Sequence, residues 1–266
     1  MKNNNMKIYV ALLSLSVLIA CKDKKEKPKI DIPPPPAMMN YSIIKTYPHD
    51  TSSYTQGLQI YKGNLYEGTG NYGFSKLMKV NLATGEILQS ISLPKEYFGE
   101  GITILNDTIY QLTWKEKKVF VYTLKDFKKV KTFDANIEGW GLTNDGKNLI
   151  VSTGSSDLSY YDPSNFSLLK KITVTESGNP TFNINELEYI DGYIYANQYQ
   201  LPYILKIDPA SGKIVAKADL TSMWEKIKAI DPEADVPNGI AYDAATKKMY
   251  ITGKWWPTLF EIQLGQ

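Results

Sequence analysis

The chain has one cysteine, Cys21, and one histidine, His49, among 266 residues. A single cysteine excludes an intramolecular disulfide and a cysteine-rich metal cluster. With a single histidine we expect neither a histidine-based metal site nor a Ser-His-Asp triad. His49 stands in "YPHD", where we expect a turn or a structural hydrogen bond.

An excess of charge is also missing. The formal net charge is +2, and setting aside Lys2 and Lys7 near the N-terminus leaves about 0 for the rest. Binding to nucleic acid would call for a dense basic face, so we expect no nucleic-acid partner. Hydrophobic residues make up 43% of the chain, enough for a core, and 19 tyrosines favour strands.

Long apolar runs are absent except near the N-terminus, where "IYVALLSLSVLIA" follows the basic "MKNNNMK". This pattern predicts a signal peptide over residues 1–20. The ending Leu18-Ile19-Ala20-Cys21 resembles a bacterial lipobox, so we expect a lipid anchor on Cys21 and a place in the bacterial cell envelope, on the periplasmic face or the cell surface. Residues 21–40, charged and then proline-rich, predict an extended tether. The globular domain is expected over residues 41–266.

A repeat runs through that domain. A short turn followed by an apolar or aromatic strand residue recurs five times, as "GNLY", "NDTIY", "GKNLI", "DGYIY" and "TKKMY". We call the last residue of each motif its anchor: Tyr66, Tyr110, Ile150, Tyr195 and Tyr250. A period of roughly 40–50 residues holding about four short strands is the size of one β-propeller blade. The sequence therefore predicts an all-β fold, a five-bladed β-propeller. The longest interval also contains "DLTSMWEKIKAI", which predicts a short helix inserted in the last repeat.

The repeat register selects candidate site residues. Ten residues before the first four anchors, and twelve before the fifth, stand the strand-starting residues Gln56, Glu100, Trp140, Asn185 and Asn238. Equivalent positions of innermost strands converge on the propeller axis, so these side chains are expected to ring one mouth of the channel. Four residues after the anchors, a second ring is expected from Gly70, Trp114, Gly154, Tyr199 and Lys254. Packing between blades is an open alternative for Tyr199 and for the neighbouring Trp255.

Several of these segments together carry a family resemblance. "YPHDTSSYTQGL", "YFGEGIT", "LTWKE", "EGWGLT", "NINELEYIDGYIYANQY" and "VPNGIAYD…MYITGKWWP" resemble, in order and spacing, the glutamine cyclotransferase family of plant-type glutaminyl-peptide cyclases. The resemblance implies a five-bladed propeller that converts an N-terminal glutaminyl residue into pyroglutamate with release of ammonia. It also implies peptide or protein substrates that begin with Gln, and chemistry that needs no zinc.

The same resemblance implies roles for residues. Glu100 falls on the presumed proton shuttle, and the pocket positions fall on Gln56, Trp114, Trp140, Asn185 and Lys254. We expect Glu100, Asn185 and Lys254 to be catalytic. Tyr54 stands where the family pattern has Phe, and Tyr199 stands where the aromatic wall is usually Trp. We expect both positions to bind substrate and to influence which substrates are preferred.

The chemistry fits this set of residues. The α-amine must lose a proton, the amide oxygen must be stabilised, and the leaving nitrogen must gain a proton, tasks for which one carboxyl group can serve twice. Aromatic neighbours would raise the pKa of Glu100, whereas a nearby Lys254 would oppose that shift. The flanking glycines, Gly99 and Gly101, are expected to leave the carboxylate open to the substrate, so that Gly101→Val blocks turnover without unfolding the blade.

Two other readings stay open. A surface-anchored propeller could bind peptides or small ligands in the same pocket without turnover, because fold alone does not fix function. A propeller lyase or lactonase would need more metal-binding acids or histidines at the axis. We predict no catalytic metal and no required cofactor, leave a structural cation in the channel open, and expect a monomer.

Overall fold

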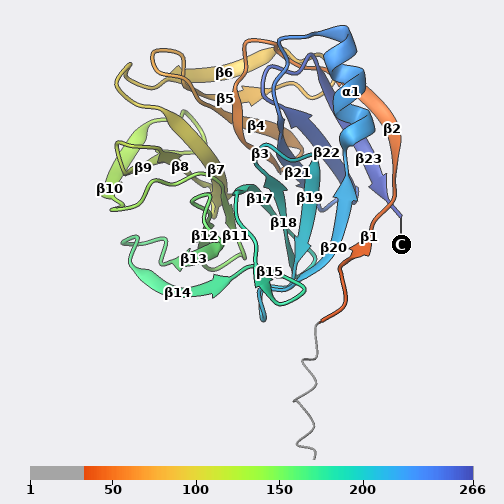
Figure 1. The fold of residues 1–266 in the computed structure, drawn as a ribbon. Coiled ribbons are helices and arrows are strands. Elements are labelled where there is room, and N and C mark those ends of the chain that lie inside the picture. The colour runs from red at the N-terminus through yellow and green to blue at the C-terminus, as the bar shows by residue number, and fades with distance from the viewer. Residues whose placement is uncertain (1–32, 266) are drawn as a thin grey trace, which may run out of the picture. The chain divides into compact units, whose positions relative to one another are not determined.

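The computed structural model describes residues 33–265, and within them 23 strands and one helix. Five four-stranded antiparallel units follow one another around a central axis (Figure 1). The predicted signal peptide, Cys21 and residues 21–32 of the predicted tether lie outside the described residues. The prediction of a five-bladed β-propeller is confirmed.

The first three blades are each built from consecutive strands. Blade 1 contains β3 (Thr55–Tyr61), β4 (Asn64–Thr69), β5 (Lys76–Val80) and β6 (Ile87–Ser92). Blade 2 contains β7 (Gly99–Leu105), β8 (Thr108–Thr113), β9 (Lys118–Thr123) and β10 (Lys129–Asp134). Blade 3 contains β11 (Leu142–Asn144), β12 (Leu149–Val151), β13 (Asp157–Tyr161) and β14 (Leu168–Thr173).

The last two blades also take strands from the N-terminal segment. Blade 4 contains β17 (Ile184–Ile190), β18 (Tyr193–Gln198), β19 (Tyr203–Ile207) and β20 (Ile214–Asp219), with β1 (Ala37–Met38) parallel to β20. Blade 5 contains β21 (Pro237–Asp243), β22 (Lys248–Gly253), β23 (Thr258–Leu264) and the outer strand β2 (Tyr41–Pro48). A short hairpin of β15 (Thr175–Glu176) and β16 (Asn179–Pro180) links blades 3 and 4.

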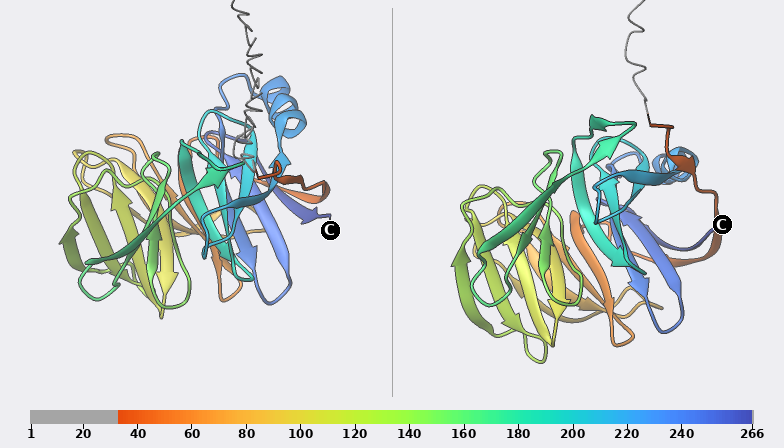
Figure 2. Two further views of the ribbon diagram at one scale, coloured as in Figure 1. Left: turned by 60° about the horizontal axis from the view of Figure 1, so that its bottom comes forward. Right: turned by 90° about the horizontal axis from the view of Figure 1, so that it is seen from below.

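Strand β2 closes the ring. It comes from the N-terminal end of the domain, yet it pairs with β23, the last strand of the chain, over the whole length from Tyr41 to Pro48. The first and last segments of the propeller are therefore held in one sheet, and the blades cannot separate without breaking this ladder. Strand β1 lies within the segment that the sequence assigns to the tether, so ordered structure begins N-terminal to Tyr41 (Figure 2).

The innermost strands β3, β7, β11, β17 and β21 contact one another in a closed ring around the axis. Outside them, five hydrophobic clusters fill the five interfaces between neighbouring blades. Each of the five repeat anchors lies in a different one of these clusters: Tyr66, Tyr110, Ile150, Tyr195 and Tyr250. The repeat is visible in the sequence because every interface requires one large apolar side chain at the same register position.

The predicted helix is present as α1 (Thr221–Ile230), outside the ring beside blade 5 (Figure 1). Its buried side chains, Met223 and Ile227, pack with Trp256 and Ile251 of the last blade. Trp224 is partly buried and packs against the same cluster. Among residues 33–265, no helix is long and apolar enough to span a membrane.

Candidate active site

One pocket of about 230 Å³ collects all the predicted catalytic and substrate-binding residues. Its lining residues are Tyr54, Gln56, Asn71, Phe98, Glu100, Trp114, Trp140, Asn185, Tyr199 and Lys254. We call it the central pocket. Side chains from all five blades reach it because each inner strand begins at the same end of the channel. Asn71 and Phe98 are additions that the register did not single out.

Glu100 lies at the start of β7 and is only 3% exposed. Within the described part of the chain, its Oε2 atom is buried and has no hydrogen-bond partner. Burial raises the pKa of this carboxyl well above its ordinary value, with Lys254 opposing the shift and Glu116 adding to it. The sequence left open whether burial or Lys254 dominates, and burial does. An unpaired buried carboxyl is costly unless a ligand supplies the missing partner.

Lys254 follows β22 and is also 3% exposed. Its Nζ atom lies 4.3 Å from the centroid of the Tyr54 ring and 5.0 Å from that of Tyr199. Burial lowers the pKa of Lys254 to about 8, although Glu100 and Asp235 favour the charged form. No ion pair of 4.0 Å or less joins Lys254 to Glu100 among residues 33–265. The carboxyl and ammonium groups thus line one pocket without neutralising each other by direct contact.

Aromatic rings form two walls of this pocket. Phe98 contacts Trp114 and Tyr54 edge to face, at centroid distances of 5.6 Å and 6.2 Å. Trp140 and Tyr199 form a second edge-to-face pair at 5.5 Å. These contacts hold the rings upright around Glu100 and reduce its access to water. Tyr199 is therefore a pocket wall, whereas Trp255 packs behind the pocket, against Tyr54 at 4.7 Å.

The amide side chains are placed differently from one another. Asn238 does not line the pocket, because its amide donates to the Thr55 carbonyl oxygen at 2.8 Å and to Gln56 Oε1 at 3.2 Å. The Gln56 oxygen is thereby occupied, which leaves the Gln56 Nε2 group to donate into the pocket. Asn185 lines the pocket directly from β17.

The glycines beside Glu100 do not serve the purpose that the sequence suggested. A Cβ atom on Gly101 would lie 2.5 Å from Leu142 N and 2.7 Å from the Trp140 carbonyl oxygen, while one on Gly99 would lie 2.6 Å from the Thr69 oxygen. These positions face the backbone of neighbouring blades, not the substrate space. The expectation that Gly101→Val would spare the fold is therefore wrong.

The second-ring glycines have a similar packing role. A Cβ on Gly70 would lie 2.4 Å from the Phe98 ring, and one on Gly154 would lie 2.5 Å from the Trp140 ring. Both glycines make room for a pocket ring and do not widen the pocket itself.

The channel holds two further buried acids, Glu186 and Glu188 of β17, that sequence reasoning missed. Glu186 accepts hydrogen bonds from the backbone N–H groups of Leu58 at 3.2 Å and Ile240 at 2.9 Å, which ties blade 4 to blades 1 and 5. Burial raises the pKa of both carboxyls well above the ordinary value. The signal was present in "NELEY": blades 1, 2, 3 and 5 have glycine directly after the ring residue, and blade 4 has Glu186 instead.

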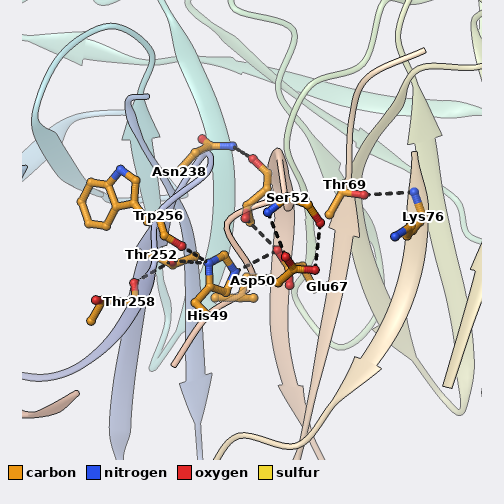
Figure 3. A network of polar contacts seen from close by, with 12 residues as sticks. His49, Asp50, Ser52, Glu67, Thr69, Lys76, Asn238, Thr252, Trp256 and Thr258 are labelled. Atoms are coloured by element: carbon orange, nitrogen blue, oxygen red, sulfur yellow. Dashed lines mark hydrogen bonds and ion pairs between the residues drawn. The ribbon is translucent and has the colours of Figure 1, made fainter. Parts of the chain in front are cut away.

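His49 lies outside the pocket, in a network between blades 1 and 5 (Figure 3). Its Nδ1 atom donates to the Trp256 carbonyl oxygen at 2.7 Å, and its Nε2 atom donates to Glu67 Oε1 at 3.1 Å. Burial alone would lower the pKa of His49, but Glu67 and the other partners outweigh it and raise that pKa. The structural role expected from the sequence agrees with this placement.

The fold and this pocket define a β-propeller with a buried carboxyl group in a pocket at one end of its central channel. Comparison with known proteins narrows that class. The family model described as glutamine cyclotransferase matches residues 11–264. The glutaminyl-peptide cyclotransferase of Arabidopsis thaliana is 38% identical over 228 residues, which cover 84% of this chain and 71% of the relative. The crystal structure of Myxococcus xanthus glutaminyl cyclase superposes with a TM-score of 0.81 at 34% identity, covering 86% of this chain and 98% of that one.

The chain belongs to the glutamine cyclotransferase family. The predictions of an enzyme, of its cyclotransferase class and of its propeller fold are confirmed.

Proposed function

We propose that this protein cyclises N-terminal glutaminyl residues of peptides and proteins, with Glu100 moving the proton between the two nitrogen atoms. The observation that carries this role is the buried carboxyl of Glu100, whose Oε2 atom lacks a partner within residues 33–265 and whose pKa burial raises well above its ordinary value. A group that must accept and then return a proton works best when its pKa lies near the working pH.

The first step is attack of the substrate's α-amine nitrogen on the γ-carboxamide carbon. A C–N bond forms, the amide oxygen takes the electron pair, and the Glu100 carboxylate accepts a proton from the attacking nitrogen. The attacking nitrogen and the amide carbon belong to the same residue and close a five-membered ring, so the substrate itself keeps them near each other. The enzyme holds the glutaminyl side chain in the rotamer that closes this ring. The rings of Trp114, Trp140 and Tyr199 form the walls that restrict this rotamer.

The second step expels ammonia. The protonated Glu100 donates its proton to the departing amide nitrogen, the carbon–nitrogen bond breaks, and the lactam carbonyl re-forms. Lys254 and the Nε2 group of Gln56 offer positive or donor groups to the oxygen that carries charge between the steps, and Asn185 orients the carboxamide. Donors placed in advance around a developing oxyanion are often the largest single contribution to catalysis.

The mechanism assigns no task to a metal ion. Among residues 33–265, no cluster of three or more His, Cys, Asp or Glu side chains is arranged to hold one. Glu186, the most obvious axial acid, already accepts two backbone hydrogen bonds. We propose that no cofactor is required, because Glu100 moves the proton while Lys254 and Gln56 stabilise the oxygen, and that turnover survives dialysis against a chelator.

The enzyme's place in the cell is a proposal from the sequence. We propose that the protein is anchored in the bacterial cell envelope by lipid on Cys21, because the apolar run leads into "LIAC", which ends at the only cysteine. We also propose that it is a monomer. Cys21→Ser should abolish incorporation of a labelled fatty acid and release the protein from membranes. Retained label in that variant would overturn the anchor.

The direct test is cyclisation itself. The purified protein is incubated with a peptide beginning in Gln, and both ammonia and the mass of the peptide are followed. We expect one ammonia released per peptide, and no reaction with the same peptide carrying an acetylated N-terminus, because its nitrogen cannot attack. A rate no higher than the spontaneous one would contradict the proposal.

A further inference from the structure

A second cavity adjoins the central pocket on its blade 1 side. It has a volume of about 250 Å³, and its walls include Ser53, Asn71, Phe74, Lys76 and Trp255. We call it the outer pocket. Asn71 lines both cavities, and Trp255 packs on Tyr54, a wall of the central pocket, at 4.7 Å. The two cavities are therefore neighbours that share the Asn71 side of their walls.

The strand register explains why the cavity lies between blades 1 and 5. Lys76 and Met78 are two residues apart on β5, so their side chains point to the same face. Met78 belongs to the hydrophobic cluster that joins blades 5 and 1. Lys76 comes at the beginning of the same strand, where the cluster ends. The outer pocket is thus the open end of an otherwise filled interface between blades.

The outer pocket contains a polar group without a partner. Ser53 is only 2% exposed, and its Oγ atom is buried without a hydrogen bond to any described residue. Trp255 adopts a left-handed backbone conformation, with φ of 61°, and its N–H donates to the Ser53 carbonyl oxygen at 2.8 Å. Bulky residues rarely adopt this conformation, and such strain is often found beside binding sites.

Lys76 is the one charged side chain among the described residues that line the outer pocket, so this lining carries a positive charge. Lys76 makes no ion pair of 4.0 Å or less with any residue in the described range. Asp50 does not line this pocket, and its two carboxylate oxygens accept hydrogen bonds from the N–H and Oγ of Ser52 at 2.8 Å and 2.9 Å (Figure 3). Phe74, 75% exposed, adds an apolar surface at the rim.

We propose that the outer pocket binds the side chain of the second residue of the substrate, and that Lys76 makes it prefer an acidic residue there. This inference rests on the proposed function. Cyclisation changes only the first residue, so the second residue and those after it must extend out of the central pocket while the first residue is bound there. Neighbouring Cα atoms are about 3.8 Å apart, so a second side chain reaches a cavity that shares a wall with the first.

The test compares glutaminamide, which has no second residue, with peptides that differ only in the second residue: Gln-Glu, Gln-Ala and Gln-Lys, each extended by the same neutral tail. We expect kcat/KM to fall from Glu to Ala to Lys by about threefold per step, the size typical of a partly exposed charge pair. Lys76→Glu should reverse this order and leave glutaminamide unchanged. Phe74→Ala should raise KM for the peptides alone.

Lys79→Glu is the matched control. It makes the same change of charge on β5, but its side chain points to the opposite face from Lys76, so the order of substrates should stay as in the wild type. The proposal is overturned if Lys76→Glu keeps the wild-type order, or if Lys79→Glu shifts it equally.

A binding measurement separates this inference from the proposed function. The affinity of Glu100→Gln for the three peptides, measured by calorimetry, is expected to follow the same order. Acidic preference in affinity without any turnover by the wild type would overturn the proposed function alone. Turnover with no preference at the second residue, in rate or affinity, would overturn the outer pocket alone.

Discussion

The ammonium group of Lys254 lies 4.3 Å from the centroid of the Tyr54 ring, and a second ring, Tyr199, lies 5.0 Å away on another blade. Ring faces attract a cation without donating a proton to it or accepting one from it. Tyrosines at these two positions therefore hold the charge of Lys254 in a buried pocket and leave its three N–H groups for the substrate.

The ring of Tyr54 should matter more than its hydroxyl. The hydroxyl makes only a long hydrogen bond, 3.4 Å, to Asp235. Tyr54→Phe keeps the ring over Lys254 and should retain activity within about threefold. Tyr54→Ala loses the cation–π contact and should lower kcat/KM by about tenfold, the upper part of the usual range for such a contact. Equal losses in the two variants, measured with one Gln peptide, would show that the hydroxyl is what counts.

The pKa of Lys254, about 8 against an ordinary 10.5, predicts an alkaline limit to activity. If the charged ammonium stabilises the oxyanion, kcat/KM should fall as the pH rises above about 8. Arginine stays charged throughout this range, so Lys254→Arg should lose the descending limb even if its maximal rate is lower. The rise of kcat/KM at lower pH follows deprotonation of the substrate's α-amine and of Glu100, and it should be the same in both enzymes. A descending limb at the same pH in both enzymes would contradict a role for the Lys254 charge.

Replacing Glu100 separates chemistry from folding. Glu100→Gln keeps the size of the side chain but removes the proton carrier, and we expect kcat to fall by about 10²–10⁴-fold with little change in KM. The variant should also resist unfolding better at higher pH. The pKa of Glu100 is raised in the folded state, so ionisation costs stability as the pH rises above about 4.5, and glutamine lacks that cost.

Thermal unfolding across pH checks the second part of this prediction. The difference in Tm, variant minus wild type, should be smallest near pH 4 and grow toward alkaline pH. A kcat near that of the wild type would remove Glu100 from the mechanism. A Tm difference that shrinks as the pH rises would show that the carboxyl is paired in the folded protein.

The sequence predicted those features that repeat with the blades. Five anchors at one register position revealed the propeller because each interface between blades needs the same kind of side chain, and the same register brought Gln56, Glu100 and Asn185 to one pocket. Phe98 and Asn71 were missed because they lie off the two register positions: Phe98 stands two residues before Glu100, and Asn71 stands five residues after Tyr66, not four. The ladder of β2 with β23 was also not foreseen, because pairing between the two ends of a domain leaves no local pattern.

The role that the sequence suggested for the glycine after Glu100 was wrong. At Gly101 the sequence shows only that no side chain stands next to Glu100. That fits an open substrate site and close packing of neighbouring backbones equally well. The distance decides between them: a Cβ there would lie 2.5 Å from Leu142 N. Five strands can form so narrow a ring only if neighbouring backbones approach closely, a constraint that needs coordinates from two blades.

Gly101→Val should therefore fail to fold, not merely fail to turn over substrate. The branched side chain would force apart β7 and β11, the innermost strands of blades 2 and 3, and open the hub. We expect little soluble protein, or a Tm lowered strongly. Gly265→Ala is the control, since a Cβ there meets its nearest atom at 3.4 Å, and it should behave as the wild type. Soluble, inactive Gly101→Val with an unchanged Tm would restore the open-site explanation.

The buried pair of His49 and Glu67 should stabilise the closure of the ring. Because Nδ1 and Nε2 of His49 both face acceptors, the charged imidazolium is the form that satisfies the network. His49→Gln leaves the Glu67 carboxylate buried without its cation, and should lower the free energy of unfolding by about 3 kcal/mol near pH 6, as for other broken buried pairs. The exposed pair of Lys62 and Asp107 is the comparison: Lys62→Gln should leave the free energy of unfolding nearly unchanged, because solvent screens this pair.

The pH dependence of the His49 contribution has a definite sign. The pKa of His49 is raised in the folded protein, so the stabilisation is fully present below about pH 6.5 and is lost as the pH rises through the folded value. Urea unfolding of the wild type and of His49→Gln at pH 6 and pH 9 measures this. The difference in free energy of unfolding between the two proteins should be smaller at pH 9 than at pH 6. A gap that is constant or widens would mean that His49 stabilises the closure as a neutral hydrogen-bonding ring.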